Sequence, residues 1–187
     1  MTEMIIFIVL VVCTLLWVAM VYNRLIKLRN LKEEGWSGID VQLKRRHDLV
    51  ANLVATVKKF MSHEKDILEE VTKIRADAIS QSAGGAMNAG RAEGELTQAL
   101  GRLFSIMETY PDIKANTNVL SMQEELSALE HTLQSARRYY NATVRDLNIK
   151  IESFPSNLIA GKFGFTKAEY FEITNPGDRE AVVSFDN

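Results

Sequence analysis

The sequence has a single cysteine and only three prolines. One cysteine, Cys13, cannot build a disulfide framework, and its place in an apolar stretch argues against a cysteine–histidine catalytic pair. Three prolines, at positions 111, 155 and 176, leave long segments free to form helices. The 22 basic and 24 acidic residues nearly balance, which is not the charge of a nucleic-acid binder. We therefore expect no nucleic-acid partner.

Motifs for metal or cofactor chemistry are missing as well. A di-iron bundle needs Glu-x-x-His pairs, and no histidine, at 47, 63 or 131, follows a glutamate by three positions. His63-Glu64 begins like a zinc-protease helix but lacks the second histidine of that motif. We expect no catalytic residue, no metal ligand and no cofactor. A hydrolase or metalloenzyme is therefore disfavoured as a function.

The chain does contain one long uncharged run, Met4–Tyr22. As a helix these 19 residues would rise about 28 Å, close to the hydrocarbon thickness of a bilayer. We predict a transmembrane helix over 4–22, preceded by an extracytoplasmic stub, residues 1–3. A signal peptide is disfavoured because no positive segment precedes the run. The alternative of a lipoprotein attached at Cys13 is disfavoured by the bulky Val12 before it.

Cations follow the span on one side only. Basic residues near a span favour the cytoplasmic side, so we predict the N-terminus outside and 23–187 in the cytoplasm, with a periplasmic bulk domain as the alternative. The run Lys44–His47 is either an anchor for acidic groups or a solvated helix face. The residues expected to contact the membrane surface or a partner are Arg24, Lys27, Arg29, Lys32, Lys44 and Arg45.

Apolar residues recur at helical spacing from the span to Ser80, which predicts one helix continuous with the span. Gly35–Gly38 is its weak point, where a bend is expected. A glycine-rich loop, Ser82–Gly90, would lie at the membrane-distal end, and a second helix would cover Arg91–Tyr110. A capping box, Ser121–Glu124, predicts the start of the third long helix.

That third helix would end at Phe154, before Pro155. The tail that follows has a short apolar segment, Leu158–Phe165, and a second capping box, Thr166–Glu169, and we expect one or two short helices there. We therefore predict an all-α fold, in which a transmembrane helix continues into a long antiparallel bundle of three long helices plus a short fourth. The expected divisions are a membrane-proximal helix (23–38), the bundle (39–154) and short helices with a tail (155–187). In the tail we expect a turn at 175–178 and either a strand or disorder at 181–185.

The membrane-proximal segment has an apolar stripe without an expected partner in the chain. A third helix ending at 154 would cover the first helix only from about Ile39 to Ser80. We therefore expect other copies of the protein, or else lipid headgroups, to cover this stripe. The predicted oligomer contacts are Leu25, Leu28, Leu31 and Trp36.

Polar residues at helical spacing within the apolar pattern predict a buried network. Arg137, Tyr140 and Asn141 share one turn, and Asn148 follows Asn141 by one heptad. Such groups fix helix register at a cost in stability. We predict a structural network across the core, with a ligand site as the alternative. Its members would be Arg46, Asn52, Glu108, Arg137, Tyr140, Asn141 and Asn148.

A set of short motifs is spread from the span to about residue 172. They are Tyr22-Asn23, Ile39–Leu49, Asn52–Val54, Val57-Lys58, His63-Glu64, Glu108–Asn116 with Tyr110-Pro111-Asp112 at its centre, Arg137-x-x-Tyr140-Asn141, Asn148, Phe154-Pro155 and Tyr170–Glu172. In these motifs the sequence resembles the LemA family of bacterial membrane proteins. Ala51, where the family usually has proline, and Leu147 are departures.

The resemblance implies a membrane helix with a helical bundle in a bacterial inner membrane, and it implies no catalytic activity. Some relatives are linked to magnetosome membranes, and others to a membrane protease. Our first functional hypothesis is a self-assembling, membrane-associated scaffold that organises or shapes the membrane. The second is an adaptor or regulator that binds a membrane protein, such as a protease, through residues 82–92 or the tail.

Overall fold

The computed structural model describes residues 1–61 and 63–172. All regular structure in these residues is helical, which confirms the predicted all-α class. The turn expected at 175–178 and the segment 181–185 lie outside the described residues. The helices are α1 (Thr2–Val57), α2 (Lys65–Ser82), α3 (Ala86–Met107), α4 (Pro111–Lys114), α5 (Thr117–Glu152) and α6 (Ser156–Lys162).

The chain divides into two compact units, and α1 and α5 each contribute to both. Unit 1 contains Met1–Ser37 and Arg138–Ala168, and unit 2 contains Gly38–Arg137 and the described residues from Glu169 to Glu172. Each unit has its own buried apolar cluster.

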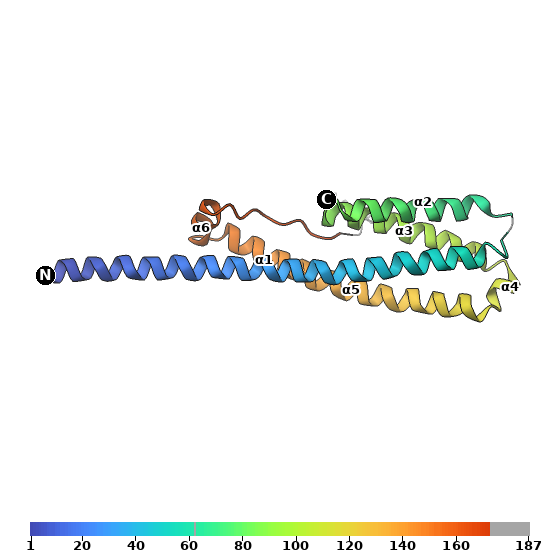
Figure 1. Ribbon diagram of the computed structural model, residues 1–187, viewed down its shortest axis with the longest axis horizontal. Coiled ribbons are helices and arrows are strands. Elements are labelled where there is room, and N and C mark those ends of the chain that lie inside the picture. The colour runs from blue at the N-terminus through green and yellow to red at the C-terminus, as the bar shows by residue number, and fades with distance from the viewer. Residues whose placement is uncertain (62, 173–187) are drawn as a thin grey trace, which may run out of the picture. The chain divides into compact units, whose positions relative to one another are not determined.

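Unit 2 is a bundle of four helical segments in which α1 and α3 run one way and α2 and α5 run the other (Figure 1). Its core is built from the apolar faces of all four segments together with α4. Large fully buried members come from each part: Leu53, Val71, Leu96, Leu103, Ile113 and Val119.

The predicted single helix from the span to Ser80 is wrong. α1 ends at Val57, and α2 begins at Lys65 and folds back. No proline or glycine marks the break, but seven of the nine residues 58–66 are polar or charged. The fold-back buries Met61 in the turn and the α2 residues Leu68 and Val71 against the core, which a straight helix would leave in water.

Two further boundaries differ from prediction. The glycine-rich loop is only 83–85, because α3 begins at Ala86. Ser82, just before this loop, lines a groove with Asp40, which lies near the start of the part of α1 that belongs to unit 2. The loop is therefore not at the far end of that helix. α5 begins at Thr117 rather than at the Ser121 capping box, since the Asn116 carboxamide accepts the first free backbone amides, Asn118 N at 3.1 Å and Val119 N at 3.3 Å.

Unit 1 is formed by the first part of α1 with the end of α5, α6 and the chain up to Ala168. Its buried cluster is Val21, Leu25, Leu28, Leu147 and Ala160. α6 is the one short helix of this region, and Thr166–Glu169, where a second capping box was expected, is not helical.

Gly35 and Gly38 do not interrupt α1. A Cβ at Gly35 would lie 3.2 Å from Tyr140 Cα, so this glycine lets α5 approach α1 closely within unit 1. The expected bend is replaced by a helix–helix contact.

Gly90 in α3 makes the closest approach in unit 2. A Cβ there would lie 2.2 Å from the backbone oxygen of Glu172, next to the fully buried Phe171. The segment 169–172 therefore lies directly on α3 at this glycine.

We predict that Gly90→Ala displaces this segment. Alanine favours a helix over glycine by about 1 kcal/mol. The control is Gly101→Ala on the same helix, where an added Cβ would have no neighbour within 4 Å, and it should stabilise the protein by up to that amount. Gly90→Ala should gain no stability and should speed amide hydrogen exchange at 169–172. Equal stability of the two variants, with unchanged exchange, would contradict the close approach.

Candidate functional site

The main polar site is a buried ion cluster between α1 and α3. The Arg46 guanidinium donates to Glu93 Oε2 at 2.9 Å, and His47 Nε2 lies 2.6 Å from Glu93 Oε1. All three side chains are at least 94% buried. Both carboxylate oxygens of Glu93 are therefore engaged by neighbouring residues of one helix.

Further contacts extend the cluster to the other two helices of unit 2. Arg46 donates to the Thr97 hydroxyl of α3 at 2.8 Å and lies 3.6 Å from Glu130 of α5. From α2, Arg75 Nε donates to the backbone oxygen of His47 at 2.7 Å. Two consecutive residues of α1 are thus tied to all three partner helices.

The predicted network contains Arg46 but none of these partners. Asn52 and Glu108, two of the predicted partners, are exposed, so that pairing is wrong. Glu93 was missed, although it precedes Leu96, Leu100 and Leu103 by three, seven and ten positions and therefore lies on the apolar face of α3. A charge in this phase is the signal that identifies a buried carboxylate.

The Lys44–His47 run divides between solvent and core. Lys44 and Arg45 are exposed, and Arg45 pairs with Glu125 at 2.6 Å, a solvated ion pair of small energetic weight. Arg46 and His47 point inward instead, because Arg46 follows Leu43 by three residues and precedes Val50 by four. A solvated face therefore describes only the first half of the run.

Other members of the predicted network have separate partners. In unit 2, Arg137 lies over the Phe171 ring with 5.8 Å from Cζ to the ring centroid. Burial lowers the pKa of its guanidinium, and the attraction of Glu130 only partly offsets this effect. In unit 1, the Asn148 side chain forms two hydrogen bonds with the backbone of Ala168. Its Nδ2 donates to the carbonyl oxygen at 3.0 Å, and its Oδ1 accepts from the amide at 2.9 Å.

Two more members of that network lie on α5 in unit 1. Tyr140 is buried and its ring lies 5.7 Å from that of Trp36, centroid to centroid. Asn141 is half-buried.

The stripe predicted to contact other copies is covered within the chain. Leu25 and Leu28 are buried with Leu147 and Ala160, and Leu31 and Trp36 are half-buried. The premise that residues 24–38 lack an internal partner is therefore wrong. The reason is that α1 ends at Val57 instead of Ser80, so the final turns of α5 lie beside this part of α1, and α6 folds onto it.

The cations beside the stripe remain accessible. Arg24, Lys27 and Arg29 are exposed and Lys32 is half-buried. Arg29 and Lys32 line a small hollow of about 230 Å³ with residues 164–168 of the same unit.

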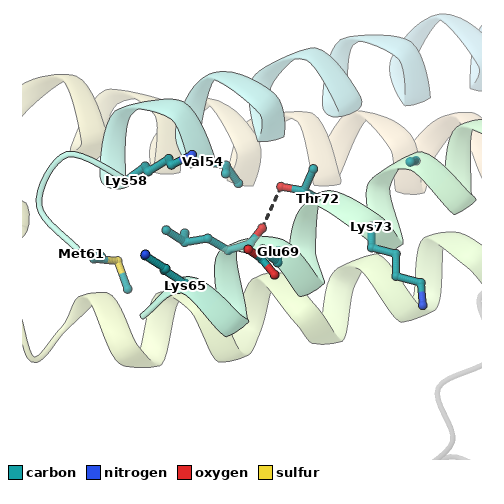
Figure 2. A pocket seen from close by; sticks show the side chains of 9 residues that line it. Val54, Lys58, Met61, Lys65, Glu69, Thr72 and Lys73 are labelled. Carbon is teal, nitrogen blue, oxygen red and sulfur yellow. Dashed lines mark hydrogen bonds between the residues drawn. The ribbon is translucent and has the colours of Figure 1, made fainter. Parts of the chain in front are cut away.

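A larger groove of about 770 Å³ lies in unit 2 beside the α1–α2 turn (Figure 2). Val54 and Lys58 from the end of α1, Met61 from the turn, and Lys65 and Glu69 from α2 contribute to its lining. The groove combines apolar walls with lysines.

Tyr110 connects this turn to the end of α3. Its hydroxyl donates to Glu64 Oε1 at 2.9 Å. The hydrogen bond to Glu64, followed by desolvation and the charge of Glu64, raises the pKa of Tyr110 above its usual 10.0.

Among residues 1–61 and 63–172, α1 is the one helix long and apolar enough to cross a membrane, and only 6% of its most apolar 18-residue window is buried. In the same described residues, no group of three or more His, Cys, Asp or Glu side chains is placed to hold a metal ion.

The fold and site define an all-α, membrane-associated protein with an exposed apolar helix and an ion-paired bundle. The chain belongs to the LemA family, whose sequence profile matches residues 35–185. It is 26% identical to magnetosome protein MamQ 2 of Paramagnetospirillum magneticum, across 96% of this chain and 75% of that protein. Magnetosome protein MamQ of Magnetospirillum gryphiswaldense is also 26% identical, with 87% and 68% covered. Protein LemA of Metamycoplasma hominis is 24% identical, with 80% and 68% covered.

We predict that Glu93→Gln destabilises the bundle by about 3 kcal/mol, because it leaves Arg46 buried without its full counter-charge. Denaturant unfolding measures the change. The control Glu95→Gln, exposed on the same helix, should alter stability by less than about 0.5 kcal/mol. The double variant Arg46→Met with Glu93→Leu should lose less than Glu93→Gln, since it removes both charges together. A Glu93→Gln protein as stable as the Glu95→Gln control would refute the buried pair.

We also predict a pH dependence at Tyr110. A raised folded-state pKa stabilises the fold below the unfolded pKa, and this contribution is lost as the pH rises through the folded value. The wild type should therefore be more stable than Tyr110→Phe at pH 8, and the difference should shrink above pH 10.0. Paired denaturant titrations from pH 8 upward measure it. A difference that stays constant across this range would show that the Tyr110 proton is not linked to folding.

Proposed function

We propose that this protein is a non-enzymatic, single-pass membrane scaffold. The observation that carries the proposal is that α1 supplies both the exposed apolar span and the residues Arg46 and His47, which hold the four helices of unit 2. A bundle organised on the helix that enters the membrane suits a structural role. The polar cluster supports the absence of catalysis, because Glu93 is buried and fully engaged by Arg46 and His47.

Copies of the protein assemble laterally and thereby organise or shape the membrane. The stripe at 24–38 gives no support for such contacts, because Leu25 and Leu28 are buried within the chain. Its support is the span itself, whose large side chains are exposed all around the helix, among them Phe7, Leu10 and Leu16. In lipid, van der Waals packing between the side chains of neighbouring spans drives helix association. The names of the MamQ relatives, magnetosome proteins, are consistent with a role in organising a membrane.

Mass measurement of the full-length protein in a mild detergent tests the assembly. We expect particles several times heavier than the 21.1 kDa chain after correction for detergent. Substitution of exposed span residues, such as Leu16→Ala, should reduce the mass, whereas Leu120→Ala, an exposed residue of unit 2, should not. A strict monomer would overturn the scaffold. A monomer or dimer that co-purifies with one stoichiometric membrane protein would favour the adaptor.

The bundle faces the cytoplasm from the bacterial inner membrane, with the N-terminus outside. The support is the set of cations after the span, since Arg24, Lys27 and Arg29 are exposed and available to anionic headgroups.

Thiol labelling tests this orientation. In a Cys13→Ser background, a cysteine introduced by Ser127→Cys occupies an exposed position of α5. It should not react with a membrane-impermeant maleimide in intact cells and should react after permeabilisation. Thr2→Cys, at the other end of the span, should react in intact cells. The reverse pattern would place the bundle outside the cytoplasm.

A further inference from the structure

The exposed apolar surface of unit 1 does not end with the span. Three large side chains around α6 are exposed: Phe154 by 80%, Leu158 by 62% and Phe163 by 54%. From residue 153 to 166 the sequence carries a single charge, Lys162. Clustered apolar side chains of this size mark a surface that another phase or molecule covers.

Ring contacts place α6 beside the end of the span. The Tyr22 ring lies 4.9 Å from that of Phe163 and 5.9 Å from that of Phe165, centroid to centroid. Val21 and Ala160 belong to one buried cluster, against which Trp17 also packs. In Figure 1, α6 lies alongside α1, closer to the N-terminal end of that helix than α5 lies. Since Tyr22 closes the apolar run, α6 lies at the depth where hydrocarbon gives way to headgroups.

Charged residues follow in the order that an interface requires. Arg24 and Lys27 are exposed on the next turns of α1, and the Arg29 guanidinium lies 5.8 Å from the Phe165 centroid. Going along α1 from the span, the surface is first aliphatic, then aromatic, then cationic. This order of aliphatic, aromatic and basic side chains is typical of the cytoplasmic boundary of a membrane span.

We propose that residues 154–163, the α6 cap, insert into the bilayer interface, so that lipid covers Phe154, Leu158 and Phe163. Lipid is the occupant because the ring contact between Tyr22 and Phe163 joins the cap to the end of the exposed apolar span. The protein is then held to the membrane by two elements, the span and a short interfacial helix. The inference rests on the membrane placement of the span, and it does not depend on lateral assembly.

Spin-label accessibility in liposomes tests the α6 cap in the full-length protein. In a Cys13→Ser background, a nitroxide is attached at Leu158→Cys and, separately, at Phe154→Cys. Both sites are exposed, so labelling should leave the fold intact, which circular dichroism checks. The control is Tyr139→Cys, which is 46% exposed and contacts α1 at Gly35, about 20 Å beyond Tyr22. A label at Leu16→Cys reports the span.

We expect the labels at 154 and 158 to collide more with oxygen and several-fold less with a water-soluble nickel complex than the label at 139. Aqueous behaviour at 154 and 158 with a lipid-exposed Leu16→Cys would overturn the inference and leave the span in place. Shielding of these labels from both reagents would also overturn it, because protein would then cover the cap. An aqueous Leu16→Cys would instead remove the membrane placement on which the inference rests.

Discussion

Unit 2 depends on one constraint, the burial of Arg46 together with Glu93. A guanidinium at this depth is tolerated only while a carboxylate faces it at hydrogen-bond distance, here 2.9 Å. Such a pair adds little net stability compared with an apolar pair, but it penalises every register in which the two charges miss each other. His47, Thr97 and Glu130 contact this pair directly, and Arg75 donates to the backbone of His47, so the constraint involves all four helical segments.

Apolar spacing was enough to predict the all-α class, but not where the chain reverses. Spacing of three and four residues continues from Val57 through Phe60 to Ile67 closely enough to suggest one helix, and no glycine or proline interrupts it. The reversal has a tertiary cause, since Leu68 and Val71 are buried only when α2 folds onto α3. The local signal is the stretch 58–66, in which only Phe60 and Met61 are apolar, too few to continue an apolar helix face.

The sequence predicted only one side of the ion cluster, the buried cation. Arg46 belongs to the predicted buried network, yet its run of basic neighbours favours a solvated face. The phase of Glu93 on the face of Leu96 and Leu100 indicates burial, and matching one buried cation to one buried anion would have predicted the pair. Partners such as Thr97 and Glu130 depend on helix packing, which spacing alone does not supply.

The burial of Leu25 and Leu28 changes which surface needs a partner. A stripe left bare by its own chain would have required other copies, but α5 and α6 cover it. The described apolar side chains that remain exposed in unit 2, such as Val41 and Leu120, are scattered along the sequence, whereas those of unit 1 concentrate on the span and around α6. Scattered apolar residues are normal on a protein surface, and a concentrated set requires a covering phase. Lipid is therefore the first candidate to cover the exposed apolar surface of unit 1. Any contacts between copies would have to replace lipid on the surface of the span.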